Sequence, residues 1–241
     1  MTSVLVDYRI SDAIERRLMA LGFYPLRLPP SASLPEAIAS HPDTLVCRIG
    51  DELITSADYC DEAAYIFTEL RERHPSLKIR FTEDAFGKEY PSDCPFNALK
   101  LGKRLYARGE SISAAVLDTA REHGYEHISV RQGYPACTTL AFESDAGELA
   151  ITADCGMARV LSSCGVSVTK IENGAIALPP YEYGFIGGAS GVYKSKIYFL
   201  GDLSTHPSAD AIRAAALSAG FDTVSLSDEE LFDGGGLIFI D

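Results

Sequence analysis

Apolar and polar positions recur in a fixed order along the chain, and the clearest copy begins at Thr138. The segment "TTLAF" alternates like a strand, the polar "ESDAGE" is typical of a loop, and "LAITAD" reads as a second strand. In "CGMARVLSSCG" the apolar residues share one helical face, at Met157, Val160, Leu161 and Cys164. Gly165 suits a helix C-cap, and the alternating "VSVTKIE" follows. The pattern predicts the order strand, strand, helix, strand.

The same order appears three more times. From Phe185 it reads "FIGGASG", "KIYFLGD", the helix "SADAIRAAALSAG" and "FDTVSLS". From Asn97 it reads "NALKLG", "RLYARGE", "SISAAVLDTAREHG" and "YEHISVR". From Thr44 it reads "TLVCRIG", "ELITSAD", a helix through "YCDEAAYIFTELRERHP" and "LKIRFT". The alternative is chance recurrence of such patterns in an ordinary α/β protein.

A fifth copy is divided between the two ends of the chain. "SVLVD" serves as its second strand, "SDAIERRLMALG" as its helix and "FYPLRL" as its third strand, but the first strand is missing there. The last segment, "GLIFID", supplies it by pairing antiparallel with "SVLVD". This pairing would leave no orphan edge, because a closed ring has none.

An acidic residue ends each predicted second strand and marks the period. These residues are Asp7, Asp58, Glu110, Asp154 and Asp202. They are spaced by 44 to 52 residues, and a similar step leads from the last one through residue 241 back to the first. We therefore predict an α/β fold of five ββαβ units, forming a single domain of residues 1–241 in which residues 236–241 complete the N-terminal unit.

Five such units in a ring resemble the pentein, or guanidino-group-modifying, α/β propeller over essentially the full chain. More narrowly, "GFIGGASG", "GDLSTHP" and "QGYPAC" look like an uncharacterised bacterial family of this fold. The superfamily contains deiminases, dimethylargininases and amidinotransferases, and also non-enzymatic members. The resemblance implies a central channel and brings no established activity with it.

The resemblance also implies where a nucleophile would be. Guanidine-modifying penteins use a cysteine, a histidine and acidic residues, with the cysteine in a pattern such as G-G-G-x-I-x-C. Here the corresponding run begins at Gly234 and reads "GGGLIFI", so Ile240 occupies the cysteine position. A hydrocarbon side chain cannot act as a nucleophile. We therefore expect no deiminase reaction through the C-terminal strand.

Composition and charge narrow the possible partners. The 241 residues carry a net charge of −13, which disfavours nucleic acid and anionic membranes and attracts a cationic partner. No signal peptide and no apolar run near the ~20 residues of a membrane helix is present. The six cysteines show no zinc-type spacing, so we expect reduced thiols, a cytoplasmic location, no metal and no cofactor. The oligomeric state is left open.

Glycines and acidic residues suggest a ligand site in the channel. Two predicted first strands begin with glycines, at Gly187, Gly188, Gly235 and Gly236. They mark either crowding where strands converge or space for a ligand. We predict that Asp154 and Asp202 hold a guanidinium by bidentate hydrogen bonds. The alternative is that each caps the helix that follows it.

Cys137 and His206 are the candidate reactive pair, with Asp202 as the third candidate catalytic residue. Cys137 opens a first strand, and its alternative is an inert buried thiol. His206 precedes Pro207 at a predicted helix start, and its alternative is a polar cap. Two cysteines, Cys47 and Cys164, are expected in the hydrophobic core. The remaining histidines are expected in loops or at the surface: His41, His74, His123 and His127.

The function predicted first is a channel site for a cationic guanidino or amino-acid-like ligand, with hydrolase or deiminase-like chemistry on C–N bonds left uncertain. The rival is a non-catalytic binding or scaffold protein that kept the ring and lost the nucleophile. Ile240 favours the rival, whereas the acidic charge and the Cys137/His206 pair favour the first function.

Overall fold

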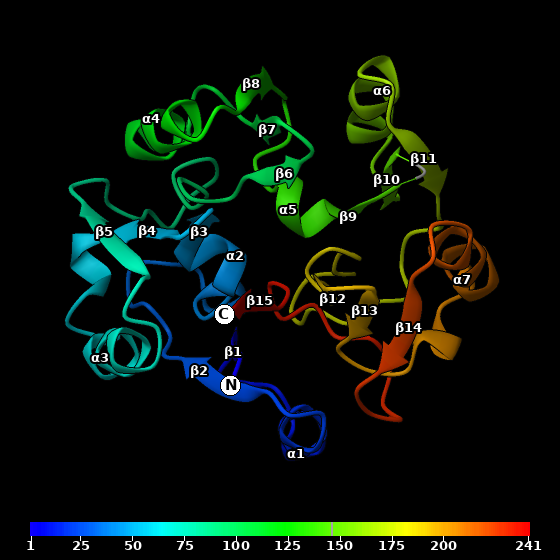
Figure 1. Ribbon diagram of the computed structural model, residues 1–241, viewed down its shortest axis with the longest axis horizontal. Helices are drawn as coiled ribbons and strands as arrows, with labels where there is room; N and C mark the ends of the chain where they lie inside the picture. Colours follow the sequence, from blue (N-terminus) through cyan, green and yellow to red (C-terminus); the bar gives the residue numbers. More distant parts are fainter. Residues whose placement is uncertain (146) are drawn as a thin grey trace.

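The computed structural model describes residues 1–145 and 147–241; Ala146, in the predicted loop "ESDAGE", lies outside the described residues. The described residues form five three-stranded sheets and seven α-helices (Figure 1). In each sheet the central strand pairs antiparallel with one neighbour and parallel with the other. The sheets surround a common centre, and the longer helices lie on the periphery (Figure 1). The fold is mixed α/β.

Each predicted unit contains one sheet and one long helix. The first has β15 (Ile238–Ile240), β1 (Ser3–Asp7), α1 (Asp12–Ala20) and β2 (Tyr24–Leu28). The second has η1 (Glu36–Ile38), α2 (Pro42–Leu45), β3 (Val46–Ile49), β4 (Glu52–Ser56), η2 (Ala57–Tyr59), α3 (Ala64–Arg73) and β5 (Lys78–Thr82). The third has β6 (Leu99–Leu101), β7 (Arg104–Ala107), α4 (Ala114–Glu122) and β8 (Glu126–Ser129). The fourth has α5 (Pro135–Thr138), β9 (Thr139–Ser144), β10 (Gly147–Thr152), α6 (Cys155–Ser163) and β11 (Ser167–Lys170). The fifth has β12 (Ser190–Tyr193), β13 (Lys196–Phe199), η3 (Leu203–Thr205), α7 (Ala209–Ser218) and β14 (Asp222–Ser225).

The two ends of the chain share a sheet, as predicted. β15 pairs antiparallel with β1, with Ser3 opposite Ile240 and Leu5 opposite Ile238. The side chain of Asp241 accepts hydrogen bonds from the hydroxyls of Thr2 (2.8 Å) and Tyr193 (2.7 Å). The C-terminal strand therefore has a partner. The five sheets are otherwise separate, and within the described residues no strand joins one sheet to the next.

Helix α6 shows how the sequence determines where a helix begins, where it ends and which face it buries. Asp154 caps its start by accepting from the Met157 N–H, and Gly165 follows its end at φ +84°, a conformation that favours glycine. The helix buries Met157 and Leu161 in a cluster that includes β6 residues of the neighbouring unit. Adjacent units therefore share core residues, and this packing holds the inner ends of their strands in place.

Two first strands begin later than predicted, because a single helical turn precedes each. Thr44 lies in α2 and Thr138 lies in α5, and both turns start with a proline at the first helical position, Pro42 and Pro135. These short turns lie toward the centre (Figure 1). No helix within residues 1–145 and 147–241 is long and apolar enough to cross a bilayer.

Candidate functional site

The segments that precede the first strands contact one another through their backbones near the centre. Gly188 N–H donates to Cys137 O (2.9 Å), and Gly234 N–H donates to Gly188 O (3.0 Å). Asp43 N–H donates to Gly235 O (3.1 Å). Residues from the first, second, fourth and fifth units are thereby fixed relative to one another. These backbone hydrogen bonds set the positions of the side chains that the segments carry.

A fully buried histidine lies among two buried acids. His41, Asp7 and Asp233 have no exposed surface. His41 Nε2 lies 3.7 Å from Asp7 Oδ2, and His41 Nδ1 lies 3.8 Å from Asp233 Oδ1, so neither ring nitrogen makes a hydrogen bond. Arg9 holds Asp7 bidentately, with N–O distances of 2.9 and 2.7 Å. Buried polar atoms are rarely left unpaired, and where they are, they often mark a functional site.

Cys137 belongs to the same group. Its Sγ, a ring nitrogen of His41 and a carboxylate oxygen of Asp233 all lie within 4.8 Å of one another. These sulfur, nitrogen and oxygen donors could hold a divalent ion such as zinc, for which the sequence shows no motif. Burial raises the pKa of the Cys137 thiol well above its usual value, and the negative charges of Asp43 and Asp233 raise it further. Without a ligand, Cys137 is therefore a protonated thiol.

Burial shifts the pKa values of Asp43, Asp233 and His41 toward their neutral forms. Burial raises the pKa of Asp43 to about 7, and the charge of Asp233 adds to the effect. Burial also raises the pKa of Asp233, although His41 opposes the shift. For His41 burial lowers the pKa, against the pull of Asp233 and Asp7. Titratable groups shifted in this way gather at functional sites.

A cavity of about 540 Å³ opens beside Cys137. Its wall includes three acidic residues, Asp93, Glu182 and Asp233, and five aromatic ones, Tyr90, Tyr134, Tyr181, Tyr183 and Phe185. The Tyr134 hydroxyl donates to Asp93 Oδ2, while the buried Asp93 Oδ1 has no hydrogen-bond partner. The Arg108 guanidinium lies over the Tyr90 ring, 5.1 Å from the ring centroid. Aromatic faces and carboxylates together suit an organic cation.

The four predicted glycines all lie at this centre. A side chain at Gly187 would meet the backbone oxygen of Ala136, and one at Gly188 would meet Asp233 Oδ1. Gly235 lies against His41 and Gly236 has φ +76°. Close approach of neighbouring segments accounts for these glycines, which favours the crowding interpretation. Their role in ligand binding stays a prediction.

The side chains predicted to act with Cys137 do not line its cavity. Asp154 accepts from Met157 N–H and from Gln132 Nε2, and Asp202 accepts from Ser204 N–H at the start of η3. Hydrogen bonds from Ser204 lower the pKa of Asp202. Both acids thus serve as caps, and neither lines the cavity that Cys137 lines.

His206 is likewise occupied locally. Its buried Nδ1 accepts from the Ser208 N–H (3.0 Å), and burial lowers its pKa. The histidine beside Cys137 is instead His41. The sequence predicts a loop or surface position for His41 and His74, and both lie in segments between elements, but His41 is fully buried and His74 is only 6% exposed. A local signal for His41 exists. "HPDTLV" and "YPACTT" both place a proline at the start of a turn before a first strand.

Comparison with solved structures gives matches along almost the whole chain. An amidinotransferase of the saxitoxin pathway from Microseira wollei superposes with a TM-score of 0.58 at 11% identity, covering 94% of this chain and 78% of that one. A dimethylarginine dimethylaminohydrolase gives 0.56 at 8% identity, with 94% and 92% covered. An inosamine-phosphate amidinotransferase from Streptomyces griseus gives 0.54 at 12% identity, with 94% and 88% covered. At these identities the likeness shows the fold, which is that of the pentein superfamily.

Comparison of the sequence with curated proteins gives no match. One family model, described as a family of unknown function (DUF6873), matches residues 5–238. Because that match spans nearly the entire sequence, the chain belongs to the family of unknown function DUF6873, with a pentein fold.

Proposed function

We propose that the cavity beside Cys137 binds a small organic cation of the guanidino or amino-acid type. The proposal includes the architecture: residues 1–241 act as one domain, a five-fold propeller ring closed by the β15–β1 pair. The observation that carries it is Asp93, a buried carboxylate with one unpartnered oxygen in a wall of aromatic rings. A guanidinium would supply the missing donor and lie against the rings.

The size and charge of the cavity support this ligand class. About 540 Å³ is within the range of small-molecule sites. Three carboxylates line the cavity against one cation, Lys88, so the wall attracts positive charge. Solved relatives of the same fold include an amidinotransferase and a dimethylarginine dimethylaminohydrolase, whose names describe work on guanidino groups.

Hydrolysis of a C–N bond at Cys137 is the chemistry that this arrangement favours. A bound cation would offset the negative charges that raise the thiol pKa, and the neutral His41 ring could accept the thiol proton. The sulfur would bond to the guanidinium carbon, and the C–N bond to one amine would break as His41 returns the proton to that amine. Water would then cleave the C–S bond, releasing a ureido product and restoring the thiol.

Ile240 favours a second candidate function, a binding protein without turnover. Its side chain has no exposed surface and packs with Leu5 in an apolar cluster, at the position where the enzyme motif has cysteine. A protein of this kind would bind the cation and leave it unchanged.

Calorimetry with arginine, agmatine and asymmetric dimethylarginine tests the shared part of both functions. Asp93→Asn should weaken binding at least about tenfold, as expected for loss of one charged hydrogen bond. Asp118→Asn, on the exposed face of α4, is the matched control and should bind normally. Equal affinity of wild type and Asp93→Asn, or no binding by wild type, would reject the proposal.

Product analysis separates the two functions. Wild-type protein should release ammonia or an amine if Cys137 is a nucleophile, whereas Cys137→Ala and His41→Ala should not. Because His206 lies outside the cavity, His206→Ala should keep its activity. Binding without any product would assign the non-catalytic function.

A further inference from the structure

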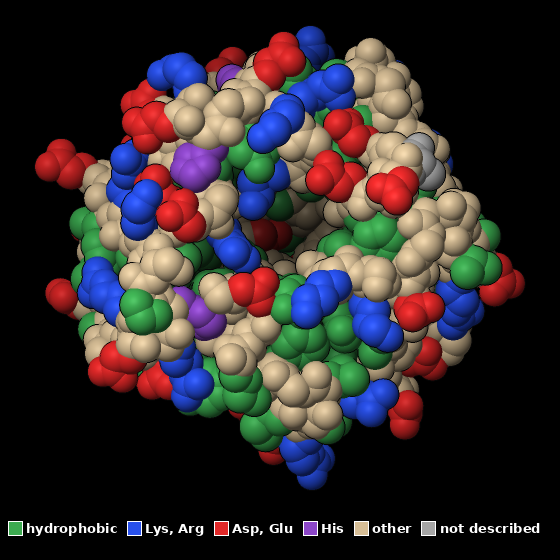
Figure 2. Space-filling view, in the orientation of Figure 1, with side chains coloured by type: hydrophobic (Ala, Val, Ile, Leu, Met, Phe, Trp, Pro, Cys, Tyr) green, Lys and Arg blue, Asp and Glu red, His purple; other side chains and the backbone are tan. Residues whose placement is uncertain are grey.

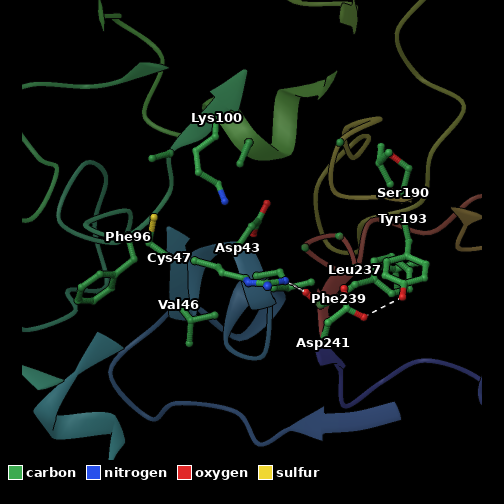
Figure 3. A pocket seen from close by; sticks show the side chains of 18 of the residues that line it. Asp43, Val46, Cys47, Phe96, Lys100, Ser190, Tyr193, Leu237, Phe239 and Asp241 are labelled. Carbon is green, nitrogen blue, oxygen red and sulfur yellow. Dashed lines mark hydrogen bonds between the residues drawn. The ribbon is translucent and has the colours of Figure 1, made fainter. Parts of the chain in front are cut away.

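A second cavity, of about 430 Å³, lies along the first strands on the other side of the central contacts. Ala136, Gly187 and Gly235 line it, whereas Cys137 and Asp233 line the cavity already described. The hollow is visible at the centre of the face in Figure 2, with Lys and Arg side chains on its wall. Figure 3 shows the Lys100 and Asp43 side chains pointing into it.

Lys100 and Arg48 bring positive charge into this cavity. Lys100 is the middle residue of β6, where Leu99 and Leu101 are buried in the core, so strand alternation turns Lys100 to the channel. Arg48, in β3, donates only to the backbone oxygens of Phe239 and Gly50. Within the described part of the chain, neither residue has a carboxylate within 4.0 Å.

Both cations are partly exposed at the wall of the cavity. Burial lowers the pKa of Lys100, and the charge of Arg48 lowers it further. Burial lowers the pKa of Arg48 as well, although the charge of Asp241 opposes the shift. Like charges in a poorly solvated site repel each other and are unfavourable unless an anion compensates them. The chain has a net charge of −13, so solubility does not explain why Lys100 and Arg48 share one cavity.

Two acidic residues, Asp43 and Asp241, share this cavity with the cations. Asp241 accepts hydrogen bonds from Thr2 and Tyr193, and its negative charge attracts Arg48, so Lys100 is the cation left without an acidic partner within 4.0 Å among the described residues. Asp43 lies at the inner end, and its pKa of about 7 leaves it partly protonated at neutral pH. Lys194 adds a third positive charge at the rim, in the exposed turn after β12.

We propose that this second cavity binds the carboxylate or phosphate group of a small anionic metabolite, held by Lys100 and Arg48. Both side chains provide several N–H donors, and Arg48 can bind two oxygens of one anion. Lys194 would attract the anion to the entrance. The site is separate from the cation cavity, so the two proposals stand or fall independently.

Calorimetry of the whole chain in low-salt buffer with inorganic phosphate and, separately, with citrate tests the proposal. We expect at least one of them to bind, and Lys100→Met to weaken that binding at least about tenfold. Lys100→Arg, which keeps the charge, should retain most of the affinity. Binding of phosphate alone would assign a phosphate-bearing ligand, and binding of citrate alone a carboxylate-bearing one.

The control is Lys78→Met, because Lys78 is an exposed lysine on β5 that lies 3.5 Å from Asp51. It should bind like wild type. If Lys100→Met does not fold, as judged by circular dichroism, Arg48→Met takes its place. The proposal is overturned if neither anion binds, if the Lys100 or Arg48 variant binds as tightly as wild type, or if Lys78→Met loses as much affinity.

Discussion

Restoring the cysteine of the enzyme motif by Ile240→Cys should not create a deiminase. Ile240 and Ile238 point from β15 into the same cluster as Cys47, so a thiol at 240 would meet hydrocarbon rather than a ligand cavity. Burial raises the pKa of Cys47 in that cluster to about 11, from a usual value of 9.0. A thiol with that pKa is on the order of a hundredfold less ionised at neutral pH than an ordinary one.

The substitution should also lower stability. Ile→Val in a core typically costs about 0.5–1.5 kcal/mol and Ile→Ala about 2–5 kcal/mol, so Ile→Cys should fall between, at about 1.5–3 kcal/mol. Urea unfolding measures this, with Ile240→Val as the milder control. Thiol labelling and ammonia release from arginine and agmatine measure the chemistry. Rapid labelling of one additional thiol together with ammonia release would refute our placement of Ile240 in the apolar core.

Three further outcomes follow from the buried charges and thiols. Folding raises the pKa of Asp43 from 3.8 to about 7, so stability should fall as pH rises between these values; Asp43→Asn should remove that fall in urea unfolding measured from pH 4 to 8. Arg9→Met leaves the buried Asp7 without its bidentate partner and should cost about 1–3 kcal/mol, whereas Arg16→Met on exposed α1 should cost little, and equal costs would contradict the assignment. In ligand-free protein the exposed Cys155, 2.8 Å from Lys170 Nζ, should react with a thiol reagent before the buried Cys137, and a Cys155→Ser variant identifies which thiol reacts first.

The five sheets and their long helices could be predicted because the pattern of each is local. Each strand and helix has its own periodicity, as in the face of α6 that buries Met157 and Leu161, and each unit is short enough to be seen whole. The partner of β15 followed from the missing strand of the first unit. Prediction was less accurate where a proline converted the start of a strand into a helical turn, as at Pro42 and Pro135.

The candidate site was harder to predict because it is assembled from distant segments. Cys137 was identified, but His41 and Asp233 reach it from units whose closest approach no local pattern reveals. The acids chosen, Asp154 and Asp202, are caps for the helical turns that follow them, an alternative that the sequence had left open. Of the five acids predicted to end second strands, Asp7 is the one that lies fully buried beside His41. Position along the sequence could not distinguish it.

The cavity beside Cys137 and the cavity beside Lys100 lie next to the same central contacts but have different linings. Carboxylates and tyrosines line the first, whereas Lys100, Arg48 and Lys194 line the second together with Asp43 and Asp241. A backbone hydrogen bond from Gly188 N–H to Cys137 O joins two of the central segments. A small ligand could therefore bind through a cationic group in the cavity beside Cys137, or through an anionic group in the cavity beside Lys100. Lys100 has no carboxylate within 4.0 Å among the described residues, and leaving a charge uncompensated in a poorly solvated site is unfavourable. We therefore expect the two cavities to take separate ligands.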